Sequence, residues 1–415
     1  MIEAHLDAGI SVVKKLVKAG HIAYFAGGWV RDYLMNIPSD DIDIATSAST
    51  DQIIELFDKT IPVGLNFGVV IVVIDDHPYE VATFRTDRDY IDGRRPIGID
   101  PATPEEDAQR RDFTINGMFY DPLKDQLHDY VNGCKDIEAG IVRAIGVPDD
   151  RFAEDRLRMM RAIRYAARFH FVIENATLEA IAGHANQLLD AVAIERVWQE
   201  FEKMARYPHY DMALITMHRL GLLQVIFPSL SKTPTDEIIH RLKAIANYPS
   251  DAPAIGGLLE LFPDSTLEEK MALCDRFKVS NVIRDYANFF HHMENLNVKP
   301  FYMARDFDDY QWVKLYSHKF FASCFDLLAA RLPESERAQL IQEHTERQNR
   351  LNTNIQRVLN KAPILRAKHL ENAGIVPGET MGILLAEGEK LAINENLETP
   401  EAIIERLQAT SNWPK

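Results

Sequence analysis

The stretch Asp41-Ile42-Asp43-Ile44-Ala45 decides the fold of this chain, because it alternates acidic and apolar residues. In a β-strand alternate side chains share a face, so we expect both carboxylates to project together while Ile42 and Ile44 enter the core. Paired carboxylates at this spacing suit Mg²⁺. Two such ions can activate a hydroxyl group and stabilise a leaving pyrophosphate in phosphoryl transfer. A solvated strand edge is the alternative interpretation.

Upstream lies a Gly-Gly turn in the sequence Ala26-Gly27-Gly28-Trp29-Val30-Arg31-Asp32. It follows the short β-rich run 21–25 and opens what reads as a helix, an arrangement in which backbone amides can approach a phosphate closely. The turn matches neither a Walker P-loop nor the GxGxxG fingerprint. Simple chain reversal is therefore the competing explanation for it.

Downstream, three elements add candidate residues. Glu80 lies on a strand-like run, 79–84, and is a candidate third carboxylate, although an exposed strand residue would look the same. Arg94 and Arg95 follow a turn at 92–93. The run Arg110-Arg111-Asp112-Phe113-Thr114-Ile115-Asn116-Gly117 offers guanidinium groups, whose donor forks match phosphate oxygens, and an amide at Asn116 that could reach a ribose hydroxyl. A double arginine by itself is usually part of the surface.

The run 151–168 has helical apolar spacing and many arginines. At 100° per residue, one helix over this run would place Glu154, Asp155, Arg158 and Arg161 within roughly a third of its circumference. A solvated ion pair is one interpretation. The other is base recognition, because cytosine and adenine both present an amino donor beside a ring-nitrogen acceptor, whereas guanine and uracil present the reverse order. A carboxylate beside a guanidinium would select C and A without a template.

Composition indicates a globular protein with two to four domains. The chain has 415 residues, of which 46% are hydrophobic and 26% charged, and no apolar run approaches the roughly 20 residues that span a bilayer. It begins without a secretory signal, and its three cysteines lie far apart without a CxxC pair, which argues against a disulfide framework and a zinc knuckle. We therefore expect a cytoplasmic protein that does not contact a membrane.

The net charge of −16 is unusual for a protein that binds nucleic acid, because phosphate neutralisation needs clustered Lys and Arg. The segment 151–170 is a local exception, with six arginines against two acidic residues. Arg164 and Arg168 in this segment are candidate RNA contacts. A second candidate patch lies near the C-terminus and consists of Lys361, Arg366 and Lys368.

The order of the patterns predicts an α+β protein. Strand-like and helix-like runs alternate over the first 140 or so residues, and amphipathic helical patterning with proline breaks follows 148 almost to the end. No fixed-period repeat is visible, so a solenoid is not expected.

In this order and spacing, GGWVRD, DIDIAT, RRDFTING and RFAEDRLRMMRAIRYAARFHF resemble the class II CCA-adding tRNA nucleotidyltransferase and bacterial poly(A) polymerase family. The resemblance is dense over the first 170 residues and weaker beyond. It implies a catalytic head with a polymerase-β-like mixed sheet at 1–143, then an all-helical neck at 144–205, body at 206–330 and tail at 331–415, the tail contacting tRNA. It also implies metal-dependent transfer from CTP and ATP to the 3′ end of tRNA, with two Mg²⁺ ions. No obligate protein partner is inferred from the sequence.

Site residues carried over by this resemblance fall into four groups. Asp41 and Asp43 would be catalytic and would bind the metals, with Glu80 as a further metal ligand. Arg94 and Arg95 would belong to the flexible loop that the family needs for adding the terminal A, which speaks against a CC-only enzyme. The base would be selected by Asp155 and Arg158. The nucleotide site as a whole would comprise Gly27, Gly28, Arg31, Arg111, Asp112, Asn116, Asp155, Arg158 and Arg161.

Alternative functions stay open at this point. An ATP-specific transferase, either a poly(A) polymerase or an A-adding tRNA enzyme, would use the same head. The run 63–70 lacks the Arg-rich signature that poly(A) polymerases of the family usually carry there, which favours CCA addition. An inactive RNA-binding module would leave the paired aspartates unexplained, and a helical scaffold protein is motivated only by the long C-terminal half.

Overall fold

The computed structural model describes residues 2–90, 96–296 and 307–414. The chain divides into two compact units. The first comprises residues 1–242 together with 276–278, and the second comprises 243–275 and 279–415. The predicted division into head, neck, body and tail remains a prediction.

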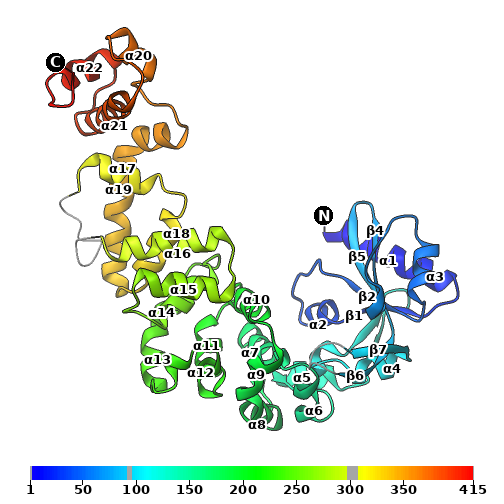
Figure 1. Ribbon diagram of the computed structural model, residues 1–415. Helices are drawn as coiled ribbons and strands as arrows, with labels where there is room; N and C mark the ends of the chain where they lie inside the picture. Colours follow the sequence, from blue (N-terminus) through cyan, green and yellow to red (C-terminus); the bar gives the residue numbers. More distant parts are fainter. Residues whose placement is uncertain (1, 91–95, 297–306, 415) are drawn as a thin grey trace. The chain divides into compact units, whose positions relative to one another are not determined.

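A mixed seven-stranded sheet, counted over the described residues, forms the centre of the first unit in the order β3-β4-β5-β2-β1-β8-β9 (Figure 1). β2 and β5 run parallel, whereas the other neighbours are antiparallel. The strands of this sheet are β1 (Ala23–Ala26), β2 (Asp43–Thr46), β3 (Thr60–Gly64), β4 (Val69–Ile74), β5 (His77–Thr83), β8 (Phe119–Asp121) and β9 (Gln126–His128). Two small two-stranded sheets pair β6 (Arg85–Tyr90) with β7 (Pro96–Pro101) and β10 (Ile141–Val142) with β11 (Val172–Ile173).

Helices pack on both sides of this sheet. Phe25, Ile42 and Ile44 join the apolar side chains of α1 and α3 in one core cluster, whereas Ala26 and Ala45 belong to a second cluster. Because side chains alternate along a strand, Asp43 shares its face of β2 with Ala45 and not with Ile44. The helices of this part are α1 (Ile2–Lys18), α2 (Gly28–Leu34), α3 (Thr50–Leu56), α4 (Pro104–Gln109) and α5 (Gly133–Ala139), with 3-10 helices η1 (Leu65–Phe67) and η2 (Thr114–Asn116).

The rest of the first unit is helical apart from β11. Its helices are α6 (Pro148–Glu154), α7 (Leu157–Phe169), α8 (Asn175–His184), α9 (Leu188–Ala191), α10 (Ile194–Ala205), α11 (Tyr210–Arg219), α12 (Leu222–Ile226) and α13 (Thr235–Leu242). α7 packs against both α10 and α11. These contacts hold α7 in the centre of the helical layer.

The regular secondary structure of the second unit, over its described residues, is all helical. Its helices are α14 (Ala254–Glu260), α15 (Leu267–Phe277, whose last two residues count with the first unit), α16 (Asn281–Glu294), α17 (Asp309–Tyr316), α18 (Phe321–Ala330), α19 (Glu334–Leu359), α20 (Ala367–Asn372), α21 (Glu379–Asn394) and α22 (Pro400–Gln408). α20, α21 and α22 share a small apolar core of their own. No helix formed by the described residues is long and apolar enough to cross a membrane.

The predicted fold class is confirmed, since a mixed sheet with helices precedes a mostly helical remainder. Two local predictions are wrong. The strand begins at Asp43, so Asp41 lies in the preceding loop and does not share a strand face with Asp43. The run 151–168 is not one helix, because Asp155 adopts an extended conformation (φ −146°, ψ 104°) between α6 and α7. Its carboxylate accepts a hydrogen bond from the Leu157 amide at 3.0 Å, a local bond that competes with helix formation.

Candidate active site

A cavity of about 1140 Å³ lies within the first unit and collects most of the predicted site residues. Its wall comes from five segments: the turn that opens α2, the loop before β2, the segment at 110–116, α7 and α10. Ten Lys and Arg side chains and seven Asp and Glu side chains line it. In a chain with a net charge of −16, this excess of cations makes the cavity a suitable place for an anionic substrate.

Carboxylates gather where the sheet borders this cavity. Asp43 and Glu80 are register partners in the parallel pair β2–β5, so their side chains leave the same face of the sheet. Burial, followed by the nearby charges of Glu80 and Asp41, raises the pKa of Asp43 to about 7, although Arg111 lowers it. Asp43 and Asp41 line the cavity. The three predicted metal ligands are therefore neighbours.

The Gly-Gly turn brings backbone close to Asp43. Gly27 has φ 66°, a conformation that favours glycine, and a Cβ built on it would stand 3.4 Å from Asp43 Oδ2 and 3.3 Å from Arg111 Nη1. Arg111 is held in place because Asp107 Oδ2 accepts hydrogen bonds from its Nε at 3.1 Å and its Nη2 at 3.0 Å. The guanidinium of Arg111 also stacks on the Phe119 ring at 4.7 Å. The Gly27 backbone and the Arg111 guanidinium thus lie on either side of a space next to Asp43.

Arg31 lies at the same turn but is almost fully buried, with 3% of its surface exposed. Its Nε and Nη2 donate to Asp32 Oδ1 at 2.9 and 2.7 Å, and its Nη1 donates to Asn116 Oδ1 at 2.5 Å. Asn116 in turn donates to Asp112 Oδ1 at 3.1 Å. The four residues form one buried network. Triphosphate binding by Arg31 and Asn116 stays a prediction.

Asp112 joins the α/β region to α7. Arg161 donates to its Oδ2 from Nε at 2.8 Å and from Nη2 at 2.6 Å. Burial alone would raise the pKa of Asp112, but Arg161 and Arg158, together with the hydrogen bonds from Asn116 and Arg161, lower it to about 2. Asp112 is therefore a charged, internally paired group.

Asp155 and Arg158, the predicted base-selecting residues, both line the cavity. The Arg158 amide donates to the Asp155 carbonyl at 3.0 Å, but their side chains bind other partners. The Asp155 carboxylate accepts from Arg196 Nη2 at 2.8 Å and Nη1 at 3.3 Å. Arg158 Nη1 donates instead to Glu154 Oε2 at 2.5 Å. The break at Asp155 explains the difference, since it removes the helical neighbourhood that a continuous helix would have provided.

The arginine-rich run 151–168 is largely neutralised within the protein. The buried Arg164 pairs with the buried Glu200 at 2.7 Å, and Arg168 pairs with Asp32 at 3.0 Å. Arg151 and Arg158 share Glu154. RNA contacts by Arg164 and Arg168 remain predictions, and the structure supplies both side chains with an internal partner.

Other predicted residues lie apart from the cavity. Lys361, Arg366 and Lys368 are exposed around the start of α20 in the second unit. Arg94 and Arg95 lie outside the described residues.

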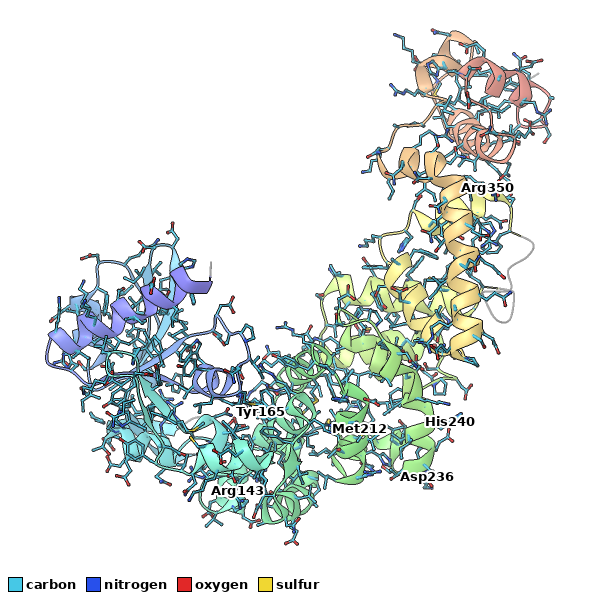
Figure 2. All side chains as sticks on the ribbon, turned by 180° about the vertical axis from the view of Figure 1, so that it is seen from behind. Arg143, Tyr165, Met212, Asp236, His240 and Arg350 are labelled. Atoms are coloured by element: carbon cyan, nitrogen blue, oxygen red, sulfur yellow. The ribbon has the colours of Figure 1, made fainter. Side chains whose placement is uncertain are left out.

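Tyr165, labelled in Figure 2, lies on α7 and lines the cavity, where its ring stacks with the Arg31 guanidinium at 5.1 Å.

Several residues of the site were missed by sequence reasoning. Asp107 holds Arg110 and Arg111, Asp32 holds Arg31 and Arg168, Arg196 holds Asp155, and Glu200 holds Arg164. Asp32, next to Arg31, and Asp107, three and four residues before Arg110 and Arg111, stand at spacings that could have indicated pairing. Arg196 and Glu200 come from a distant segment without a local signal.

Two family models match the chain. The Poly A polymerase head domain matches residues 23–143, and a probable RNA and SrmB-binding site of polymerase A matches residues 170–233. The first match covers the sheet with Asp43 and Arg111, and the second covers the helices from α8 to α12, α10 included.

Two relatives are similar over more than half of the chain. A CCA-adding enzyme of Bacillus velezensis is 42% identical over 231 residues, 55% of this chain and 58% of that protein. A CCA-adding enzyme of Bacillus subtilis is 38% identical over 285 residues, 65% of this chain and 71% of that protein. The alignment thus spans less than two thirds of the first relative and more than two thirds of the second.

Solved structures extend the likeness over nearly the whole chain. A Bacillus stearothermophilus CCA-adding enzyme in complex with CTP has a TM-score of 0.78 at 26% identity, covering 97% of this chain and 98% of that one. A Thermotoga maritima CCA-adding enzyme complexed with tRNA has a TM-score of 0.66 at 20% identity, covering 96% and 94%, and this likeness concerns the fold alone.

Proposed function

The chain belongs to the family of CCA-adding enzymes, and from this premise we propose that it transfers nucleotides from CTP and ATP, without a template, to the 3′ end of tRNA. The observation that carries the proposal is the position of Asp43, which lines the cavity together with Asp41, lies beside the Gly27 turn and Arg111, and is the register partner of Glu80. Carboxylates beside phosphate-binding donors are what metal-dependent phosphoryl transfer requires. The names of the relatives support the nucleotides and the acceptor.

We propose that Asp41, Asp43 and Glu80 hold divalent metal, with two Mg²⁺ ions as the occupants. The residues fit, because a buried carboxylate whose pKa is raised by neighbouring negative charge is stabilised by a cation. Among the described residues, no three His, Cys, Asp or Glu side chains stand close enough together to hold a metal ion by themselves. Mg²⁺ commonly uses one or two carboxylates plus substrate phosphates, so substrate would complete the site. When bound, the metal would assist ionisation of the attacking 3′-hydroxyl and offset charge on the leaving pyrophosphate.

The triphosphate is proposed to lie between the Gly27-Gly28 turn and Arg111. Lack of a side chain at Gly27 leaves the 3.3–3.4 Å approach to Arg111 and Asp43 open. Arg111 is oriented by Asp107, so its donors are fixed before substrate arrives. Asp112 and Asn116 then act behind the nucleotide, where they hold Arg161 and Arg31 in place.

Base selection is proposed for Asp155 and Arg158, on the hydrogen-bond pattern that C and A share. Both side chains line the cavity, and each already has a partner that supplies part of its hydrogen bonding. A carboxylate offers more lone pairs than Arg196 occupies, and a guanidinium has five N–H donors, so each residue can bind its partner and a base edge together. A wrong base would leave buried polar groups unpaired.

The acceptor is proposed to be the 3′ end of tRNA, with Lys361, Arg366 and Lys368 as exposed contacts elsewhere on the RNA. We further propose a cytoplasmic location, since tRNA is the substrate and the cysteines are free where the structure describes them.

Product length tests the proposal. The protein is incubated with Mg²⁺ and tRNA lacking its CCA end, and with CTP alone, ATP alone, or both. We expect two added residues from CTP alone and three when both are present. Extension by ATP alone, with CTP refused, would assign the protein to the ATP-specific transferases, and absence of any extension would leave an RNA-binding module.

A further inference from the structure

One face of α7 carries the contacts that join it to the α/β region. Arg161, Tyr165 and Arg168 follow one another at spacings of four and three residues, so they lie on the same face of the helix. Each contacts a residue of the segments that line the cavity. The Asp112 contact at Arg161 belongs to the site already described. The Asp32 contact at Arg168 has no role in it so far.

Asp32 joins two guanidinium groups that are far apart in the sequence. Its Oδ2 accepts a hydrogen bond from Arg168 Nη2 at 3.0 Å, across 136 residues of chain. Its Oδ1 accepts from Arg31, which follows the Gly27-Gly28 turn. Asp32 is only 4% exposed, so this charge depends on both partners. One carboxylate therefore ties the end of α7 to the turn proposed to hold the triphosphate.

Arg168 is oriented on its own side as well. Its guanidinium stacks on the Tyr207 ring at 4.3 Å and on the Phe169 ring at 4.6 Å, and 14% of its side-chain surface is exposed. Arg31 also stacks on Phe169, at 4.8 Å. Planar stacking restricts the rotamers of both arginines, so the bridge through Asp32 has one preferred geometry.

The Asp32 bridge lies at the opposite end of α7 from Arg158. Ten residues separate Arg158 from Arg168, which corresponds to about 15 Å along a helix. Arg161, bound to Asp112, lies between them and is close to Arg158. α7 is packed against α10 and α11, so these helices move together relative to the α/β region. Without the Asp32 bridge, the Arg161–Asp112 pair is the ion pair that remains, among the described residues, between this face of α7 and the α/β region. The helical layer can then tilt about Arg161, and such a tilt changes where the Arg158 guanidinium lies relative to the Gly27-Gly28 turn.

We propose that Arg168, acting through Asp32, is a positioning residue that sets nucleotide specificity, because it fixes α7 and hence Arg158 relative to the Gly27-Gly28 turn. The inference rests on the proposed function. It assigns Arg168 to nucleotide selection and not to RNA contact. A merely structural ion pair would lower stability and turnover for every nucleotide alike, whereas misorientation of Arg158 reduces the preference for C and A.

The test compares Arg168→Gln and Arg168→Lys with a matched control, Arg206→Gln. Arg206 lines the same cavity, is exposed and makes no ion pair with any described residue. For each variant, kcat and KM are measured for single additions from CTP and UTP to tRNA lacking CCA, and from ATP and GTP to tRNA ending in CC. Arg168→Gln is expected to reduce both discrimination ratios by roughly ten- to hundredfold, since small misplacements at a reacting site have effects of this size. KM for CTP should change less than threefold.

Further variants separate positioning from folding. Arg168→Lys keeps a charge near Asp32 and should recover part of the discrimination. In an Asp32→Asn background, Arg168→Gln should reduce discrimination no further, because the bridge is already lost. Arg206→Gln should retain the discrimination of the wild type.

Three results would overturn the inference. The first is an Arg168→Gln protein that slows all four nucleotides equally, and the second is an equal loss of discrimination in Arg206→Gln. The third is a loss in Arg168→Gln that is fully independent of Asp32. A wild-type protein that adds all four nucleotides equally would instead overturn the proposed function, and this inference with it.

Discussion

The two sides of the cavity differ in how their charges are compensated. At the sheet, Asp43, Glu80 and Asp41 bring negative charges together, and burial with this repulsion raises the pKa of Asp43 to about 7. At α7, Arg161, Arg164 and Arg168 each meet a carboxylate from another segment. The first side is incomplete without a cation, whereas the second is complete in itself. We infer that the sheet side carries the chemistry and that the helical side provides a rigid frame.

The largest effect is expected at the uncompensated side. Asp43→Asn should reduce turnover by roughly a thousandfold or more, because bound metal contributes several kcal/mol of transition-state stabilisation. Single additions from CTP to tRNA lacking CCA, followed under single-turnover conditions, measure it. Asp40→Asn, in the loop that lines the same cavity, is the control and should retain most activity. An Asp43→Asn protein with near wild-type turnover would contradict the assignment of the chemistry to the sheet side of the cavity.

Removing a carboxylate from the compensated side should instead reduce stability. Asp112→Asn leaves Arg161 without its ionic partner, which costs about 3 kcal/mol for a buried pair. Since the pKa of Asp112 is lowered to about 2, this contribution is present above pH 3.8 and is lost as the pH falls towards 2. Urea unfolding at pH 7 and below pH 4 measures both statements. Asp149→Asn, with an exposed carboxylate paired to His184, should change the free energy of unfolding by less than about 1 kcal/mol.

In protein stripped of metal with EDTA, the corresponding substitution Asp43→Asn should raise the free energy of unfolding, whereas Asp112→Asn lowers it. The unfolded chain ionises this group near pH 3.8 and the folded protein near 7, so stability present below pH 3.8 is lost as the pH rises to about 7. Asparagine cannot ionise. At pH 8, Asp43→Asn should therefore be more stable than the wild type by up to roughly 4 kcal/mol, since the pKa is raised by about three units and each unit corresponds to about 1.4 kcal/mol. Thermal unfolding measures this difference in stability between the variant and the wild type, and added Mg²⁺ should make it smaller. A variant less stable than the wild type would show that the metal-free protein already compensates the negative charge of Asp43.

The smallest effect is expected at Asp155, the residue of the helical side that is proposed to bind the base of the incoming nucleotide. Asp155→Ala should reduce the preference for CTP over UTP by roughly tenfold, because one hydrogen-bonding partner of the base is lost, at about 1–2 kcal/mol. Triphosphate binding should change little. Equilibrium binding of CTP and UTP to the variant, beside single-addition rates, separates the two. Unchanged discrimination would remove Asp155 from base selection.

Local sequence patterns predicted the strand of Asp43 and its core partners well. Ile42 and Ile44 are buried as their alternation requires, and Gly27 has the positive φ that a Gly-Gly turn favours. Asp41 was placed wrongly, because a polar residue at a strand end has no packing that fixes it to the strand. The predicted pairing of the Asp155 carboxylate with the Arg158 guanidinium was wrong for a similar local reason. The Asp155 carboxylate accepts a hydrogen bond from the Leu157 amide, and the helix is interrupted there.

Long-range partners could not be predicted from one sequence. The register of Asp43 with Glu80 depends on the parallel pairing of β2 with β5, which no local pattern encodes. Asp32 meets Arg168 across 136 residues, and such a pairing follows only from the packing of α7. The sequence therefore indicated RNA contacts for Arg164 and Arg168, but not the internal partners that buried charges need and that the fold provides in Glu200 and Asp32.

The most direct test of the account offers all four nucleoside triphosphates at equal concentration, with Mg²⁺ and tRNA lacking its CCA end, and sequences the 3′ ends of the products. We expect addition of C, C and A in that order, followed by a stop, because the protein selects the bases without a template. Products that contain U or G as often as C and A, or long tails of A, would contradict it.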